Sequence, residues 1–144
     1  MKCDPDRHRR RSIRLRDYDY AHGGAYFVTI CTHERRCLFG DIHEGEMHLN
    51  APGTMVVNVL ERLSRRFPEV EIDAYAVMPN HIHGIIWLVG APLVGALDHA
   101  ITVPTRVAPT LGNIVGAFKS ITTDEYINGV KMMEWVPYSG KLWQ

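Results

Sequence analysis

The hydrophobic and polar positions of this chain follow two different periods, and each period predicts one type of element. Residues 25–33, AYFVTICTH, are rich in β-branched and aromatic side chains and follow a pair of glycines, which predicts a first strand. Residues 37–50 alternate loosely about Glu44 and Gly45, which predicts a hairpin with a tight turn. The chain is therefore expected to begin its fold with β-structure.

A helical period begins after Pro52 and stops at Pro68, which predicts an amphipathic helix. Its apolar positions are Met55, Val56, Val59, Leu60, Leu63 and Phe67. A second helix is predicted after Thr110, a residue that can cap a helix amino-terminus. Leu111, Ile114, Val115, Phe118 and Ile121 share one face of that helix. Its end is expected near Gly129.

Two further strands are predicted between the helices, at residues 70–78 and 81–90, joined by a Pro79–Asn80 turn. Residues 90–109 have no clear period and are expected to form a long loop or insertion. The order strand, hairpin, helix, strand, strand, helix predicts an α+β fold. We expect a ferredoxin-like antiparallel sheet with helices on one face and an extra hairpin. The other sheet face would then be free for a ligand or partner.

The length of 144 residues corresponds to one domain, and no apolar run reaches the roughly 18 residues that span a bilayer. Without an apolar signal stretch at its start, the chain is expected to be cytoplasmic and not bound to a membrane. The three cysteines are odd in number and lack CxxC spacing, so free thiols are expected.

The formal net charge of zero hides a basic segment at the start of the chain. We divide the sequence into a basic arm, residues 1–20, and a core domain, residues 21–144. The arm arginines are Arg7, Arg9, Arg10, Arg11, Arg14 and Arg16. They could contact a phosphate backbone and release its counterions, or the arm could be a solvated, disordered tail.

His81 and His83 are the main candidates for chemistry. In a strand, alternate side chains share a face, so the two imidazoles would lie about 7 Å apart and could converge on one ion. They could also have no role. A histidine-triad hydrolase would need a third alternating histidine, where this chain has Ile85. A divalent metal site would need a further ligand and would leave positions open for water or a phosphate oxygen.

Several blocks around this pair resemble one family in the same order. They are GAYFVTICTHERRCLFG at 24–40, RFPEVEIDAYAVMPNHIHGIIW at 66–87 and PTLGNIVGAFKSITT at 109–123. Together they resemble the HUH single-strand DNA transposases, particularly the REP-associated tyrosine transposases, from about Arg11 onward. The resemblance implies that His81 and His83 bind Mg²⁺ or Mn²⁺. It also implies that a tyrosine attacks single-stranded or hairpin DNA and forms a 5′-phosphotyrosine.

The second predicted helix carries the candidate for that tyrosine. Tyr126 is a candidate nucleophile, but it falls on the apolar face if the second helix continues, which indicates a packing role. In the family, a segment like KLWQ at 141–144 leads into a further helix with the tyrosine and commonly a third metal ligand. A core domain without that helix is therefore expected. Glu69, Glu71 or Asp73 could instead supply a third ligand.

Together these observations predict a transposase-family protein that binds single-stranded or hairpin DNA, with Trp87 able to stack on bases. Metal-assisted strand cleavage and transfer by tyrosine is the family reaction. Two alternatives stay open: a non-catalytic nucleic-acid-binding remnant and a metal-dependent phosphoesterase. Because some members of the family dimerise and exchange the tyrosine helix, a homodimer is also an expectation.

Overall fold

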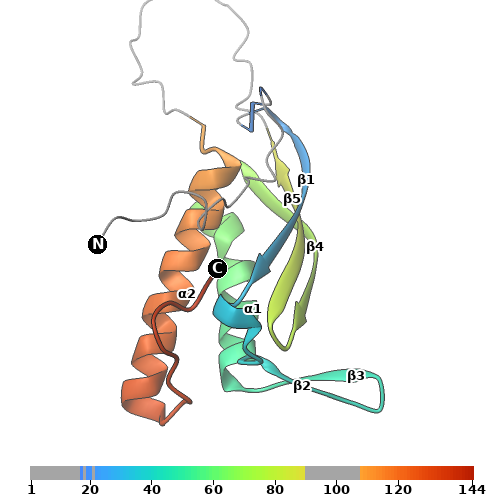
Figure 1. The fold of residues 1–144 in the computed structure, drawn as a ribbon. Coiled ribbons are helices and arrows are strands. Elements are labelled where there is room, and N and C mark those ends of the chain that lie inside the picture. Colours follow the sequence, from blue (N-terminus) through green and yellow to red (C-terminus); the bar gives the residue numbers. More distant parts are fainter. Residues whose placement is uncertain (1–16, 18, 21, 90–107) are drawn as a thin grey trace, which may run out of the picture.

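The computed structural model describes residues 17, 19–20, 22–89 and 108–144, and Figure 1 traces their fold. The elements are β1 (Gly24–Cys31), the short 3₁₀ helix η1 (His33–Arg35), β2 (Gly40–His43), β3 (Glu46–Leu49), α1 (Ala51–Arg66), β4 (Val70–Met78), β5 (His81–Leu88) and α2 (Leu111–Met133). The predicted order of elements is confirmed. The arm arginines, Arg7, Arg9, Arg10, Arg11, Arg14 and Arg16, and most of the predicted loop at 90–109 lie outside the described residues.

The centre of the fold is a three-stranded antiparallel sheet in the order β1-β5-β4. The strand that carries both histidines, β5, therefore has a hydrogen-bonded neighbour on each side. Its first residue, His81, lies opposite Cys31 of β1 and Met78 of β4. The register between β4 and β5 shifts by one residue at Asp73, which forms a β-bulge.

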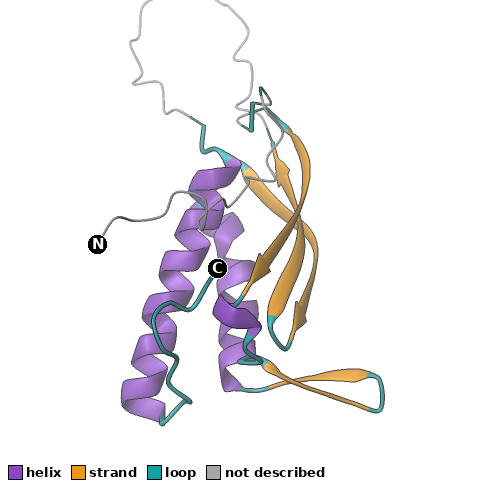
Figure 2. Cartoon of the chain, in the orientation of Figure 1, coloured by secondary structure: helices purple, strands orange, loops and turns teal. Residues whose placement is uncertain are grey.

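Both helices cover the same face of this sheet, as Figure 2 shows. The β5 side chains on that face are buried, with Ile82 2% and Ile86 4% exposed. They pack with Leu63 of α1 and with Ile114 and Phe118 of α2. The α+β fold with helices on one sheet face and an extra hairpin is confirmed, and the opposite sheet face, the open face, has no helix over it.

Local signals in the sequence account for both helix starts. The side chain of Asn50 accepts a hydrogen bond of 2.9 Å from the backbone N–H of Gly53 at the start of α1. Thr110 forms a reciprocal capping box with Asn113 at the start of α2, as its position predicted.

The predicted end of α2 near Gly129 is wrong, because the helix continues to Met133. A side chain at Gly129 would overlap the ring of Trp135, which packs directly on that backbone. The backbone N–H of Trp135 also donates to the Gly129 carbonyl. The glycine therefore marks a close approach of a ring and not a helix end.

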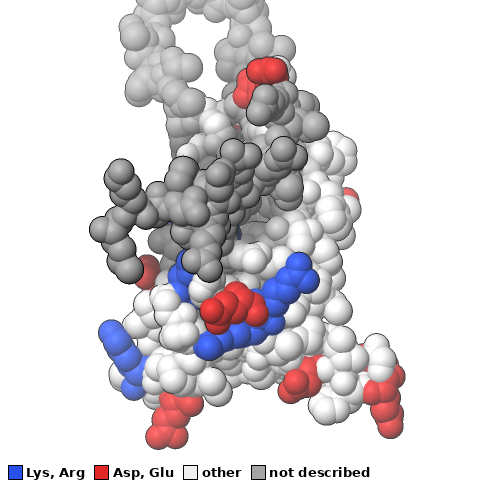
Figure 3. Space-filling view, in the orientation of Figure 1, with Lys and Arg blue, Asp and Glu red and all other residues white. Residues whose placement is uncertain are grey.

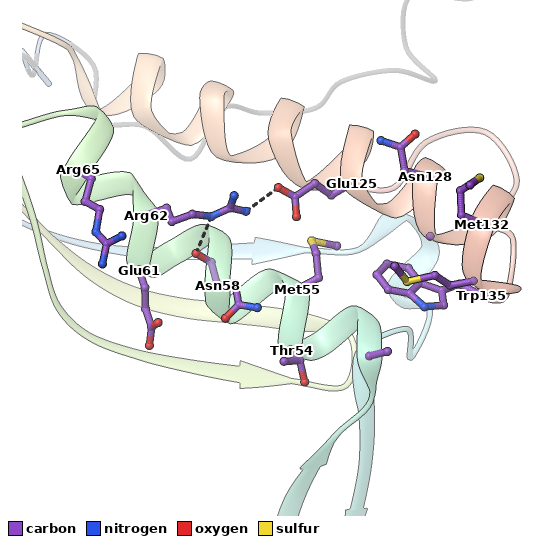
Figure 4. A pocket seen from close by; sticks show the side chains of 13 residues that line it. Thr54, Met55, Asn58, Glu61, Arg62, Arg65, Glu125, Asn128, Met132 and Trp135 are labelled. Carbon is purple, nitrogen blue, oxygen red and sulfur yellow. Dashed lines mark hydrogen bonds and ion pairs between the residues drawn. The ribbon is translucent and has the colours of Figure 1, made fainter.

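A groove of about 910 Å³ lies between α1 and α2. Arg62 and Glu125 form an ion pair across it, and Met132 and Trp135 line its far end (Figure 4). Because the side chains of Arg62 and Glu125 are 53% and 36% exposed, solvent screens this pair and it contributes little to stability.

The hairpin formed by β2 and β3 projects away from the sheet and helices (Figure 1). Its turn residues Glu44 and Gly45 both have positive φ, 52° and 83°, as a two-residue type I′ turn requires. At the base of the hairpin, the backbone N–H groups of Leu38 and Phe39 both donate to the carbonyl of Pro79. The hairpin is thus anchored to the turn that precedes the two histidines.

The last residues of the chain lie beside the end of β1. Residues 142–144 run antiparallel to residues 31–33, with a bridge between Thr32 and Trp143 and backbone hydrogen bonds of 2.8 and 3.0 Å on either side. Trp143 is only 5% exposed, and its ring lies 5.4 Å from that of Phe39. This segment belongs to the hydrophobic core.

Cys31 and Cys37 are free thiols, and Cys3 lies outside the described residues. Within the described residues, no helix combines the length and apolar character that crossing a membrane requires.

Candidate functional site

The open face of the sheet carries both candidate histidines. Because strand side chains alternate, His81, His83 and Trp87 point away from the helices, while their neighbours on β5 are buried beneath them. On the neighbouring strand, Thr29 lies opposite His83, and Phe27 lies two residues before Thr29 in β1. The site is therefore assembled from β1 and β5 on one surface.

The two imidazoles converge. The Nε2 atoms of His81 and His83 are 3.1 Å apart, and their ring planes cross at 78°. The usual spacing of alternate strand residues is about 7 Å, so both rings lean toward a common point. The convergence predicted from the sequence is thus present in the structure.

The amide of Asn80 orients the first imidazole. Its Nδ2 donates to the carbonyl of Arg35 at 3.1 Å, which leaves Oδ1 facing Nδ1 of His81 at 2.7 Å. An amide oxygen can only accept, so the hydrogen-bond network assigns the proton of a neutral His81 to Nδ1. Its Nε2 then carries a free lone pair directed at His83.

The second imidazole is held by a hydroxyl and a ring. Nδ1 of His83 lies 2.9 Å from Oγ1 of Thr29, which can donate or accept. The ring of Phe27 stacks on His83 at 5.3 Å with an angle of 24° between the planes. Phe27 is 70% exposed, so its other side faces solvent.

The surroundings of His81 favour its neutral form. Partial burial lowers the pKa of His81 below its ordinary value, and the positive charges of a protonated His83 and of Arg35 lower it further. A neutral imidazole is the form that binds a metal ion. The chemistry of this donor pair therefore fits a divalent transition metal.

A third protein ligand is not found among the described residues, which contain no cluster of three or more His, Cys, Asp or Glu side chains able to hold an ion. The expectation that Glu69, Glu71 or Asp73 completes the site is wrong for this part of the chain. The strand register places Glu71 opposite Trp87, at the end of β5 remote from His81. Alternation alone could not reveal this, because it does not define register.

Tyr126 lies on α2, on the side of the sheet away from the histidines. It is 1% exposed, its hydroxyl donates to the carbonyl of Val136 at 2.8 Å, and its ring contacts Trp135. Burial raises the pKa of Tyr126, and the nearby Tyr138 raises it further. This environment corresponds to the packing role indicated by the helical pattern, and its use as a nucleophile stays a prediction.

Thr29, Phe27 and Asn80 were not singled out from the sequence. The odd-numbered positions of β1 share a face, so alternation placed Phe27 and Thr29 together. Nothing in the sequence, however, gave the pairing of β1 with β5. Asn80 stands directly before His81, but its role depends on the carbonyl of Arg35, far from it in the chain.

Comparisons with known proteins establish a family. No family model matches the chain. A protein of Haemophilus influenzae (strain Rd), named only "Uncharacterized protein", is 40% identical over 121 residues, which cover 81% of this chain and 67% of that relative. The chain belongs to the same family as this Haemophilus influenzae protein.

One solved structure is also similar. It is described as a "putative transposase" from Deinococcus radiodurans R1 and has 17% identity and a TM-score of 0.48. The match covers 91% of this chain and 78% of that chain.

Proposed function

We propose that this chain is a transposase-family protein that binds single-stranded or hairpin DNA on the open face of its sheet, with a divalent ion at His81 and His83. One observation carries the proposal: the two Nε2 atoms converge at 3.1 Å beside an exposed aromatic ring stacked on one of the imidazoles. The ordered sequence blocks that resemble the REP-associated tyrosine transposases support the HUH type.

The aromatic side chains of the open face are placed to hold bases. Phe27 lies opposite Ile85 and Trp87 lies opposite Ala25, so the two rings are diagonal neighbours across β1 and β5. Trp87 is 43% exposed. A hollow of about 200 Å³ is lined by Phe27, His83 and Ala76. Stacking on exposed rings is tolerant of sequence, which suits single-stranded DNA.

The charge distribution indicates where the backbone would run. The hairpin of β2 and β3 carries Asp41, Glu44 and Glu46 and neither lysine nor arginine, and Figure 3 shows acidic side chains gathered on it. These carboxylates would repel phosphates. The DNA is therefore expected to avoid the hairpin, and because the exposed Glu71 lies opposite Trp87, that ring is expected to meet bases and not phosphates.

In this proposal the residues have separate tasks. His81 and His83 hold the ion through Nε2, and Phe27 and Trp87 hold bases. An ion at this position, Mn²⁺ or Mg²⁺, would polarise a phosphodiester. Imidazole nitrogens favour Mn²⁺ over Mg²⁺.

Metal and DNA binding can be tested together. We expect Mn²⁺, followed by electron paramagnetic resonance, to bind the chain and to tighten its binding to a hairpin oligonucleotide with a single-stranded flank. Loss of a residue that only hydrogen-bonds a metal ligand typically weakens metal binding by roughly 10–100-fold. His81→Gln removes a ligand itself and should weaken Mn²⁺ binding by more than that. His43→Gln, which changes an exposed histidine on the hairpin, is the matched control. Equal Mn²⁺ binding by a His81→Gln/His83→Gln chain would refute the site.

The basic arm gives a separate test of DNA binding. If several arm arginines contact phosphates, the logarithm of the affinity should fall with the logarithm of salt concentration by about 0.7 per contact on a single strand. Removing residues 1–16 should flatten that dependence. A dependence unchanged by the deletion would exclude the arm from the interface.

A second candidate function is non-catalytic nucleic-acid binding. It is favoured by the buried, hydrogen-bonded hydroxyl of Tyr126. Incubation with Mn²⁺ and single-stranded hairpin DNA, followed by a denaturing gel, separates the two. A covalent adduct that is lost in Tyr126→Phe supports catalysis by this chain, whereas binding without an adduct supports the non-catalytic role.

A further inference from the structure

We infer that Asn80 and Thr29 are positioning residues: Asn80 keeps Nε2 of His81 free to bind a metal ion, and Thr29 allows His83 to free its own Nε2 by moving the proton to Nδ1. This inference rests on the proposed metal site and adds the outer contacts that prepare it. Neither side chain would touch the ion. Each contacts Nδ1 of its histidine and thereby affects whether Nε2, on the other side of the ring, carries a proton.

The neighbours of Asn80 favour one orientation of its side-chain amide. Its backbone carbonyl accepts a hydrogen bond of 2.9 Å from the N–H of Thr32 and lies 3.0 Å from the Thr32 hydroxyl, whose single proton is shared with the nearer carbonyl of Arg36 at 2.8 Å. Thr32 itself is completely buried. If the amide flipped, Oδ1 would face the carbonyl oxygen of Arg35, and two acceptors would meet without a proton between them. The orientation that presents Oδ1 to His81 is therefore the stable one.

This orientation decides the tautomer of His81. With Oδ1 fixed 2.7 Å from Nδ1, the neutral ring keeps its proton on Nδ1 and donates it to Asn80. Nε2 is then unprotonated before any ion arrives. Metal-binding histidines are generally oriented in this way by an acceptor on the second ring nitrogen.

Thr29 gives His83 two acceptable states. Two unprotonated Nε2 atoms 3.1 Å apart would repel each other, so in the metal-free chain His83 donates from Nε2 to His81, and the Thr29 hydroxyl donates to Nδ1. When both Nε2 atoms serve as ligands, the single proton of His83 resides on Nδ1 and Thr29 accepts it. The neutral ring carries one proton in both states, so the exchange needs no change in net charge.

The tautomers can be observed directly in the metal-free, full-length chain. Long-range ¹H–¹⁵N NMR spectra distinguish Nδ1–H from Nε2–H rings, and His81→Gln assigns the signals. We expect Nδ1–H for His81 and Nε2–H for His83. In Asn80→Ala the His81 preference should be lost, while Asn80→Asp, which keeps an acceptor, should retain it.

Mn²⁺ affinity provides the second readout. Asn80→Ala should weaken Mn²⁺ binding about 10–100-fold. Asn128→Ala, which changes an exposed asparagine on α2, should leave it unchanged. Thr29→Val should weaken binding about tenfold, and Thr29→Ser should restore it. Because valine is well accepted in strands, Thr29→Val still carries the test if Asn80→Ala fails to fold.

Two results would overturn the inference. The first is an Nε2–H ring at His81 in the unaltered chain. The second is an Asn80→Ala chain that keeps the same His81 tautomer and binds Mn²⁺ within about twofold of the unaltered chain. Absence of Mn²⁺ binding by the unaltered chain would instead refute the proposed metal site. The NMR spectra of the metal-free chain would still decide whether Asn80 sets the tautomer of His81.

Discussion

Trp143 fills the core beside the end of β1, and replacing it by alanine should strongly destabilise the fold. Its ring lies 5.4 Å from Phe39 and 5.5 Å from Phe118, and Nε1 donates to Oγ1 of Thr122 at 2.9 Å. Removing a buried tryptophan side chain costs about 3–5 kcal/mol. This is a large part of the roughly 5–15 kcal/mol that stabilises a typical domain.

The hydrogen bond can be separated from the packing by a double-mutant cycle. Trp143→Phe keeps an aromatic ring and loses the N–H, while Thr122→Val removes the acceptor. Because Thr122 also donates to the carbonyl of Phe118, each single change alters more than one contact. We expect a coupling energy of about 1 kcal/mol between the two positions, the usual net value of one hydrogen bond.

Urea unfolding followed by circular dichroism measures these free energies by linear extrapolation. A loss below about 1 kcal/mol in Trp143→Ala would show that residues 142–144 do not pack as described. The same variant should also weaken Mn²⁺ binding, since residues 142–144 pair with residues 31–33, and Thr32 in that segment holds Asn80. Intact Mn²⁺ affinity in a destabilised chain would contradict that connection.

Three further changes have defined outcomes. Gly129→Ala should destabilise the fold by about 1–3 kcal/mol because its side chain would overlap Trp135. Gly116→Ala, where a side chain meets open space, should stabilise the fold by about 0.5–1 kcal/mol. Thermal unfolding compares the two variants, and equal effects would contradict the packing of Trp135 on Gly129. Phe27→Ala should change the free energy of unfolding by less than about 0.5 kcal/mol. It should weaken the binding of single-stranded DNA, measured by fluorescence anisotropy, by about 1–3 kcal/mol. Unaltered DNA binding would exclude Phe27 from the interface. Burial raises the pKa of Tyr126 in the folded chain above its ordinary value of 10.0, so the unfolded chain loses that proton first and stability should fall as pH rises above 10. Tyr126→Phe should reduce this fall, measured by urea unfolding at several pH values. A pH profile unchanged in that variant would count against the burial of the phenol.

The sequence predicted those features that depend on neighbouring residues. The Thr110 cap, the Glu44–Gly45 turn and the Pro79–Asn80 turn each arise within a few positions, so their backbone conformations follow from local chemistry. The position of His81 and His83 on one sheet face also follows from strand alternation, whereas the approach of their Nε2 atoms to 3.1 Å depends on how the rings are oriented.

Features that depend on distant contacts were missed or misplaced. Gly129 was predicted to end the helix, but in the fold Trp135 packs on it. Glu71 was a candidate third ligand, but the strand register places it beside Trp87. The link between Thr29 and His83 joins residues 54 positions apart. A hydrophobic pattern specifies which face a side chain occupies, but not which strand lies alongside it.

The bulge at Asp73 has a consequence for behaviour in solution. In the described part of the chain β4 is an edge strand, and an unbroken edge can template the addition of a strand from another molecule. The extra residue interrupts the ladder, and its exposed carboxylate places a charge along that edge. Together they oppose the addition of a strand from another molecule along β4.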